Sequence, residues 1–85
     1  MNDPILLRKT IREALAMRAS YEFTELQHFE AVRRKCVGGQ LSLEEFLKAR
    51  EWNHSEDYIK FRHDKDLSED VWQLTKSGKA KEGVR

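Results

Sequence analysis

The last third of the chain most constrains the fold, because it carries two short segments with alternating apolar side chains. They are residues 58–62 and 71–75, and the connector between them, residues 63–70, is polar and contains no glycine. Such alternation is typical of strands with one buried face, and a connector of this length predicts a hairpin wider than a two-residue turn. Three segments with helical spacing of apolar residues precede the hairpin. The sequence therefore predicts an α+β fold of three helices followed by a small antiparallel β-ribbon.

Each of the three helices begins after a residue whose side chain can accept hydrogen bonds from the first backbone amides. The capping residues are Asp3, Thr24 and Ser42, and the expected helices are residues 4–18, 25–37 and about 43–53. Gly38 and Gly39 end the second helix, since glycine enters the left-handed conformation at little cost. Tyr21 and Phe23 alternate between the first two helices and predict a short extended segment there.

The periodic apolar positions predict the core of the protein. Along the helices they recur at three- and four-residue spacing, and along the strands at every second residue. The expected core residues are Leu7, Ile11, Ala14, Leu15, Leu26, Phe29, Val32, Cys36, Val37, Leu43, Phe46, Leu47, Ala49, Ile59, Phe61, Trp72 and Leu74. On the first helix, the side opposite the apolar residues is expected to be exposed to solvent and is mainly basic.

Length and charge limit the classes of function. Eighty-five residues suffice for one domain with a modest core, expected over residues 1–78, with residues 79–85 as a flexible basic tail. Sixteen basic residues against 15 acidic ones give a net charge of +1, which excludes a polycationic nucleic-acid condenser. No apolar run approaches the roughly 20 residues of a membrane span, and the beginning of the chain lacks the pattern of a signal peptide. Together with a single cysteine, these features predict a cytoplasmic protein that does not contact a membrane.

The sequence offers no enzymatic site. His28, Cys36, His54 and His63 show no close metal-ligand spacing, and no glycine-rich phosphate loop or nucleophile elbow is present. Each histidine is better explained as a surface or partly buried side chain. We therefore expect a protein without catalytic residues, bound metal, cofactor or small-molecule substrate.

Several short motifs occur in a fixed order along most of the chain. They are Leu6-Leu7-Arg8, Tyr21, Glu45-Phe46-x-x-Ala49, Tyr58-Ile59 and Trp72-x-Leu74-Thr75-x-x-Gly78-x-Ala80. In this order, from Leu6 to Ala80, the chain resembles small winged helix-turn-helix proteins of bacteriophages and prophages. The resemblance implies a transcriptional regulator that binds duplex DNA with its third helix in the major groove and its β-ribbon, the wing, on the backbone. It also implies dimerisation, since paired half-sites are the common source of specificity for a small module.

Two positions depart from that pattern. Arg50 and Asn53 stand where leucines would complete the buried face of the third helix, so these polar side chains must find partners, extend to solvent or mark a shifted helix end. Asp57 takes the place of the usual glycine before the aromatic-isoleucine strand.

Basic residues suited to phosphate contacts lie at the end of the second helix, on the third helix and around the wing. The predicted DNA-binding residues are Arg33, Arg34, Lys35, Lys48, Lys60, Arg62 and Lys65. Each group also has a simpler explanation. Arg33 to Lys35 stabilise a helix C-terminus by their charge, and Lys60 and Arg62 cover a solvated sheet face.

The charge of the third helix favours an alternative function. Residues 38–57 hold two basic residues against five acidic ones, a net charge of −3 that repels a duplex. The alternative is a winged-helix scaffold that contacts a protein partner through Glu44, Lys48, Glu51 and Trp52. Trp52 has two interpretations at this point, an exposed anchor on the contact surface or a ring that folds back over the core.

Overall fold

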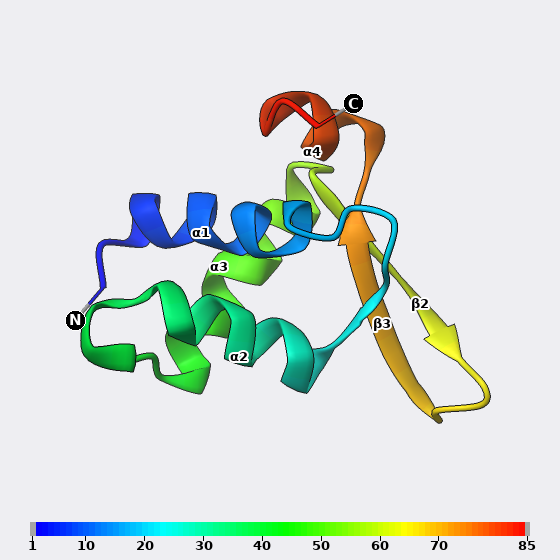
Figure 1. The fold of residues 1–85 in the computed structure, drawn as a ribbon, viewed down its shortest axis with the longest axis horizontal. Coiled ribbons are helices and arrows are strands. Elements are labelled where there is room, and N and C mark those ends of the chain that lie inside the picture. The colour runs from blue at the N-terminus through cyan, green and yellow to red at the C-terminus, as the bar shows by residue number, and fades with distance from the viewer. Residues whose placement is uncertain (1, 85) are drawn as a thin grey trace.

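The computed structural model describes residues 2–84, which form an α+β fold of four α-helices and one three-stranded antiparallel sheet (Figure 1). The elements are α1 (Pro4–Ala16), β1 (Phe23–Thr24), α2 (Glu25–Lys35), the short 3-10 helix η1 (Val37–Gly39), α3 (Leu43–Ser55), β2 (Ile59–Asp64), β3 (Glu69–Leu74) and α4 (Lys76–Lys81). The strand order is β1-β3-β2, so the first strand pairs with the last. The β2–β3 hairpin projects beyond the helices. None of the helices formed by residues 2–84 is both long and apolar enough to cross a membrane.

The helix beginnings are as predicted. The Asp3 side chain accepts from the amide of Ile5, and Thr24 and Ser42 each form a reciprocal capping box with the residue three positions later. The helix ends differ from the prediction. The first helix stops at Ala16 and the second at Lys35, whereas the third continues to Ser55. The second helix ends early because Cys36 already has an extended backbone, and the positive φ of Gly38 turns the chain next.

The hairpin is longer than predicted and turns without glycine. Its strands pair as far as Asp64 with Glu69, beyond the predicted strand ends at residues 62 and 71. The carboxylate of Asp64 accepts from the backbone amides of Asp66 and Leu67 at 2.9 and 3.1 Å, and Ser68 has a φ of 55°. An Asp side chain that replaces backbone hydrogen bonds is a common way to build a turn.

Most of the predicted core is confirmed. The predicted residues that are fully buried are Leu7, Ile11, Ala14, Leu15, Val32, Phe46, Ala49, Ile59, Trp72 and Leu74. The prediction is wrong for five residues that are exposed, namely Leu26, Val37, Leu43, Leu47 and Phe61. Val37 lies beyond the end of α2 and is 92% exposed, and Phe61 is 47% exposed because the hairpin extends past the helices that could cover it.

The two unexpected polar residues of α3 have partners. Asn53 is fully buried, donates to the carbonyl oxygens of Ala49 and Arg8 at 2.8 and 3.0 Å, and accepts from Arg12 at 2.9 Å. The guanidinium of Arg50 lies 4.2 Å from the ring centre of Trp72. Asn53 is therefore an internal hydrogen-bonding residue, and Arg50 packs its charge on an aromatic face.

Asp57 adopts a left-handed backbone conformation, with a φ of 62°. Glycine reaches this conformation without steric cost, and Asp is among the few other residues that tolerate it. The turn from α3 into β2 thus needs a positive φ whether glycine or Asp occupies it.

Residues 79–81, predicted from the sequence to lie in a flexible tail, belong to helix α4, which extends from Lys76 to Lys81. Thr75 caps this helix by accepting from the amide of Gly78 at 3.0 Å. Directly after it, Glu82 is bound by Arg12 of α1 at 2.9 Å, with both side chains buried. The sequence signal for this helix was the Thr-x-x-Gly segment, whose threonine is an N-cap residue.

His28 is completely buried, although the sequence indicated a surface or partly buried histidine. Its ring lies against Phe46, with the ring centres 5.1 Å apart and nearly perpendicular. Its Nε2 is 3.1 Å from the carbonyl oxygen of Ile11, and its Nδ1 has no hydrogen-bond partner among residues 2–84. Because a carbonyl only accepts, Nε2 carries the proton in the neutral ring. Burial lowers the pKa of His28 from 6.5 to about 4, the charge of Arg50 adds to the effect, and the hydrogen bond to Ile11 opposes it.

We expect the stability of the protein to fall as the pH decreases from 7 to 5. In this range the unfolded chain binds a proton at His28 and the folded chain does not, so protonation favours unfolding. A pKa that is 6.5 when unfolded and about 4 when folded corresponds to about 2 kcal/mol lost by pH 5. Urea unfolding at several pH values measures the effect. The variant His28→Leu should lose most of this pH dependence, and an unchanged slope in that variant would contradict the assignment.

Candidate nucleic-acid interface

The exposed side of α3 is acidic. Glu44, Lys48 and Glu51 are all exposed, and the ammonium of Lys48 lies 3.3 Å from the carboxylate of Glu44, one helical turn earlier. The only basic residue on this side of the helix among those predicted to bind DNA is therefore partly neutralised by its neighbour. Without a local rearrangement, this surface offers little attraction to a phosphate backbone.

Trp52 does not lie free on the surface of α3. Its ring is half-buried, 4.6 Å below the guanidinium of Arg8 and 6.0 Å from the ring of Tyr58. Helix α1, through Arg8, and Tyr58, the residue just before β2, therefore cover part of it. Trp52 is not, however, among the residues packed against the core.

The basic residues at the end of α2 differ in whether they form an ion pair. Arg33 forms a short ion pair with Glu30 at 2.7 Å, which lowers the pKa of Glu30 and raises that of Arg33. Arg34 and Lys35 are exposed and form no ion pair within residues 2–84. Figure 1 shows that α2 runs away from the sheet, so its basic end lies far from the hairpin tip.

The hairpin presents its basic residues on the face turned away from α3. Phe61 contacts His54 of α3, so its neighbours Lys60 and Arg62 point to the opposite face of the sheet. Arg62 is held by Glu22, with nitrogen–oxygen distances of 2.6 and 2.7 Å. Lys65, in the turn, is the one basic residue of the tip. The surrounding acidic residues are Asp64, Asp66, Glu69 and Asp70.

The predicted DNA-binding residues thus occupy three separate places: the far end of α2, the acidic side of α3 and the outer face of the hairpin. The fold brings no two of these groups into direct contact within the part of the chain described. A duplex that engaged α3 and the hairpin together would meet the acidic residues of both elements. Side-chain alternation fixed the direction of Lys60 and Arg62, but the sequence did not indicate where α3 would lie relative to them.

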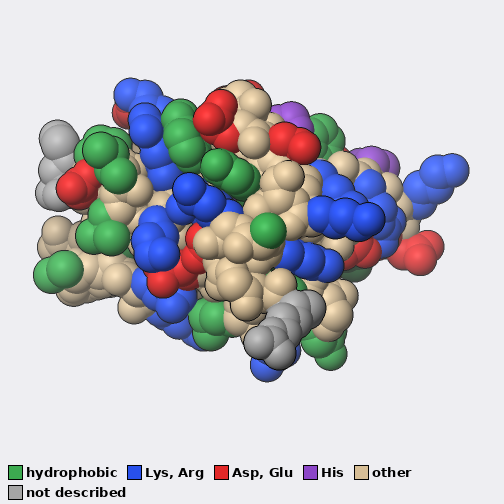
Figure 2. Space-filling model, turned by 90° about the horizontal axis from the view of Figure 1, so that it is seen from above, with side chains coloured by type: hydrophobic (Ala, Val, Ile, Leu, Met, Phe, Trp, Pro, Cys, Tyr) green, Lys and Arg blue, Asp and Glu red, His purple; other side chains and the backbone are tan. Residues whose placement is uncertain are grey.

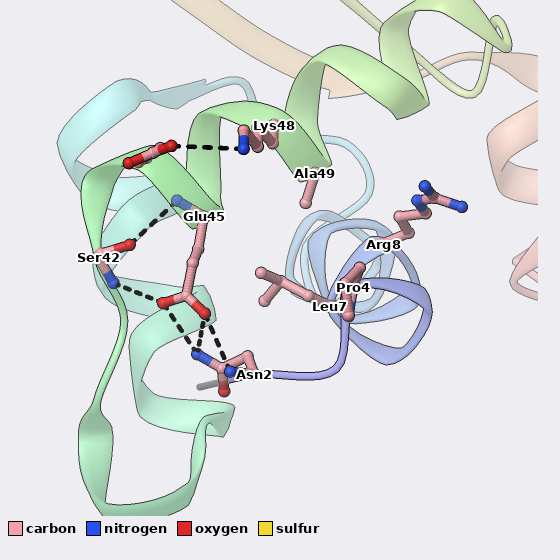
Figure 3. Close-up of a pocket in the computed structure, with 9 residues that line it drawn as sticks. Asn2, Pro4, Leu7, Arg8, Ser42, Glu45, Lys48 and Ala49 are labelled. Atoms are coloured by element: carbon pink, nitrogen blue, oxygen red, sulfur yellow. Dashed lines mark hydrogen bonds and ion pairs between the residues drawn. The ribbon is translucent and has the colours of Figure 1, made fainter.

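A groove of about 530 Å³ separates the first turns of α1 and α3 (Figure 3). Its walls include Pro4, Leu7 and Ala49, and Glu45 points across its end toward Asn2. Backbone amides of Asn2 and Ser42 donate to this carboxylate and lower its pKa to about 2. Glu45 therefore ties the beginning of α1 to α3, and its hydrogen-bonding capacity is largely used within the protein.

Sequence reasoning missed a cluster in which cations and aromatic rings alternate. Arg8 lies over Trp52, the ring of Trp52 approaches that of Tyr58, and Lys81 lies 5.7 Å from the centre of Tyr58. The buried Arg12 approaches Tyr58 from α1 at 5.2 Å. Four elements, α1, α3, the start of β2 and α4, meet at this cluster. The wet, basic side of the first helix was the available signal, but it gave no reason to place α4 beside it.

No protein-family model, curated protein or solved structure matches this chain. Any functional conclusion therefore depends on the geometry and charge of the chain itself.

Proposed function

We propose that the protein is a winged helix-turn-helix module that binds duplex DNA, acting as a transcriptional regulator of the bacteriophage and prophage type. The observation that carries this proposal is the order of the elements. A short strand between the first two helices pairs with the last strand, and a long β2–β3 hairpin follows α3 and extends beyond the helices. This arrangement agrees with the wing and helix order of the resembling proteins.

In this proposal α3 and the hairpin approach the DNA, and exposed basic residues contact phosphates. Four of the exposed basic residues form no ion pair among residues 2–84, namely Arg34, Lys35, Lys60 and Lys65. No ion pair therefore has to break before these side chains bind a phosphate. Arg33, Lys48 and Arg62 would have to exchange Glu30, Glu44 and Glu22 for phosphate oxygens. A second copy of the chain would supply a second half-site and the specificity that one small module lacks.

A second candidate is contact with a basic protein partner through the exposed side of α3. The observation in its favour is the acidic character of that side, where Glu44 and Glu51 are exposed. The exposed Leu43 and Leu47 add apolar area next to them. Trp52 is less suited to this role than the sequence suggested, because Arg8 and Tyr58 already cover part of its ring.

Titration of isotope-labelled protein with a generic DNA duplex, at low and at moderate salt, tests the proposal. We expect backbone amide shifts that weaken as salt is added, since released counterions drive phosphate binding. Absence of any shift at low salt, where even nonspecific binding is detectable, would contradict DNA binding and leave protein contact as the leading function. The control is the same titration with a short polyglutamate, which offers negative charge without the regular phosphate spacing of a duplex.

A further inference from the structure

The face of the protein formed by α1 and α4 carries several exposed basic residues. Figure 2 shows this face, with Lys and Arg side chains gathered over α1 and around α4. Arg8 and Lys9 come from α1, and Lys76, Lys79 and Lys81 come from the short α4 and surround its exposed side. The two helices are brought together by the ion pair between Arg12 and Glu82.

The acidic residues of this face do not cancel its charge. Glu82 is turned inward, with only 5% of its side chain exposed, and its nearest partner is the buried Arg12 at 2.9 Å. Lys9 approaches the same carboxylate only at 3.9 Å and keeps 54% of its side chain in contact with solvent. Glu13 is half-buried, and Glu56 and Asp57 lie at the edge of the face, in the turn between α3 and β2. The exposed positive charge of α1 and α4 therefore remains available.

Two of the cations are held in place by aromatic rings. Arg8 lies 4.6 Å from the ring centre of Trp52, and Lys81 lies 5.7 Å from that of Tyr58. A cation that rests on a ring keeps its charge while it loses part of its freedom, so less conformational entropy is lost when it binds an anion. The Trp52–Tyr58 pair thus presents two preordered charges on one surface.

We infer that the α1–α4 face, through Arg8, Lys9 and Lys81, is the principal surface on which this protein binds the phosphate backbone of duplex DNA. The inference rests on the proposed DNA binding and changes its location, from α3 and the hairpin tip to the α1–α4 face, which borders the acidic side of α3 where Arg8, Glu44 and Lys48 line one groove. Electrostatics decides between the two surfaces, because a duplex carries one negative charge for about every 1.7 Å of its axis.

Two double variants with the same loss of charge test this inference. Lys9→Gln with Lys81→Gln removes two charges from the α1–α4 face, and Lys48→Gln with Lys65→Gln removes two from α3 and the hairpin tip. Affinity for one generic duplex is measured by anisotropy from about 50 to 200 mM salt, a range over which phosphate contacts are strongly screened. Amide spectra of both variants, compared with those of the unmodified protein, establish that the fold is retained.

We expect the α1–α4 variant to bind more weakly, with its salt slope reduced by about 2, or about 1 for each lost phosphate contact. The variant of α3 and the hairpin should keep the affinity and slope of the unmodified protein. The reverse result, with loss only in the α3 and hairpin variant, would overturn the inference while leaving the proposed DNA binding intact. Failure of the unmodified protein to bind at low salt would overturn both.

A second measurement does not depend on any substitution. The indole N–H signals of Trp52 and Trp72 report on two different places, since Trp52 lies at the α1–α4 face and Trp72 is buried in the core. On addition of duplex we expect the Trp52 signal to shift together with the amides of α1 and α4. Shifts confined to the hairpin and the exposed side of α3 would overturn the inference.

Discussion

Replacement of Arg12 by methionine is expected to lower the free energy of unfolding by about 3 kcal/mol. Arg12 lies inside the protein, with 7% of its side chain exposed, and donates to Glu82 at 2.9 Å and to Asn53 at 2.9 Å. Methionine fills much of the same space but leaves the Glu82 carboxylate buried without its main partner. An unpaired buried charge costs about 3 to 5 kcal/mol. We expect the lower end because Glu82 directly follows α4 and can move outward to reach water.

The matched control is Lys9→Met, on the same helix and near the same carboxylate. Lys9 is largely exposed and lies 3.9 Å from Glu82, so its ion pair is screened and its removal should change stability by less than about 0.5 kcal/mol. The double variant Arg12→Met with Glu82→Met should regain part of the loss, because it leaves no charge buried. Chemical denaturation measures all three. A loss below about 1 kcal/mol in Arg12→Met would show that the pair contributes no more than a surface ion pair.

Hydrogen exchange distinguishes whether the Arg12→Met variant is destabilised locally, at α4, or throughout the protein. If Glu82 leaves its site to regain water, α4 moves with it and the amides of Lys79 and Glu82, which bond to Thr75 and Gly78, lose protection first. If α4 stays in place, protection falls evenly across the protein. The first pattern is expected, because the ion pair between Arg12 and Glu82 is the contact that joins the end of this short helix to α1.

The sequence was sufficient for the beginnings of the first three helices and for the order of the elements up to β3, because these depend on local chemistry. A side chain such as Thr24 or Ser42 caps the helix that follows it wherever that helix packs. The alternation of β2 likewise placed Ile59 inside and Lys60 on the opposite face. The helix beginnings and the direction of the side chains along β2 were thus confirmed, whereas the helix ends and the burial of Phe61 were not.

Predictions that depended on distant partners were weaker. Periodicity marked Leu26 and Leu43 as core residues, but both lie in the first turn of a helix, where the fold brings no other element over them. Conversely, His28 was expected at the surface or partly buried, and the sequence left open whether Asn53 finds partners or extends to solvent. Both are completely buried, because Ile11, Ala49 and Arg8 supply carbonyl groups to them. No local pattern shows that such carbonyl groups will be within reach.

The candidate site shows the same difference between features that are local in the sequence and features that depend on distant residues. The sequence identified the acidic character of the third helix, since charge can be counted along a segment. It did not identify the α1–α4 face, because Arg8 and Lys81 are more than seventy residues apart in the chain. Only the tertiary packing of Trp52 against Tyr58 brings their charges to one surface.

Gly78→Ala is expected to destabilise the protein by about 3 kcal/mol, at the upper limit for an inserted methyl group. A Cβ at this position would lie 1.9 Å from the carbonyl oxygen of Tyr58, far inside any permitted contact, and 3.1 Å from a methyl group of Leu74. The Tyr58 oxygen cannot move aside easily, because it accepts from the amide of Thr75 at 3.0 Å. The close approach of α4 to the start of β2 therefore requires glycine, which accounts for the glycine of the Trp-x-Leu-Thr-x-x-Gly motif.

The control for this change is Ser77→Ala, one residue earlier in α4 and exposed. Alanine has the higher helix propensity, so the control should be neutral or slightly more stable. Thermal unfolding of both variants measures the difference, and the Tyr58 amide in a heteronuclear spectrum reports whether α4 still contacts β2. Gly78→Ala should unfold at a clearly lower temperature, with the Tyr58 signal shifted. If its stability matched that of Ser77→Ala, α4 would not be packed against Tyr58 in solution, and Lys81 could not be held on the Tyr58 ring.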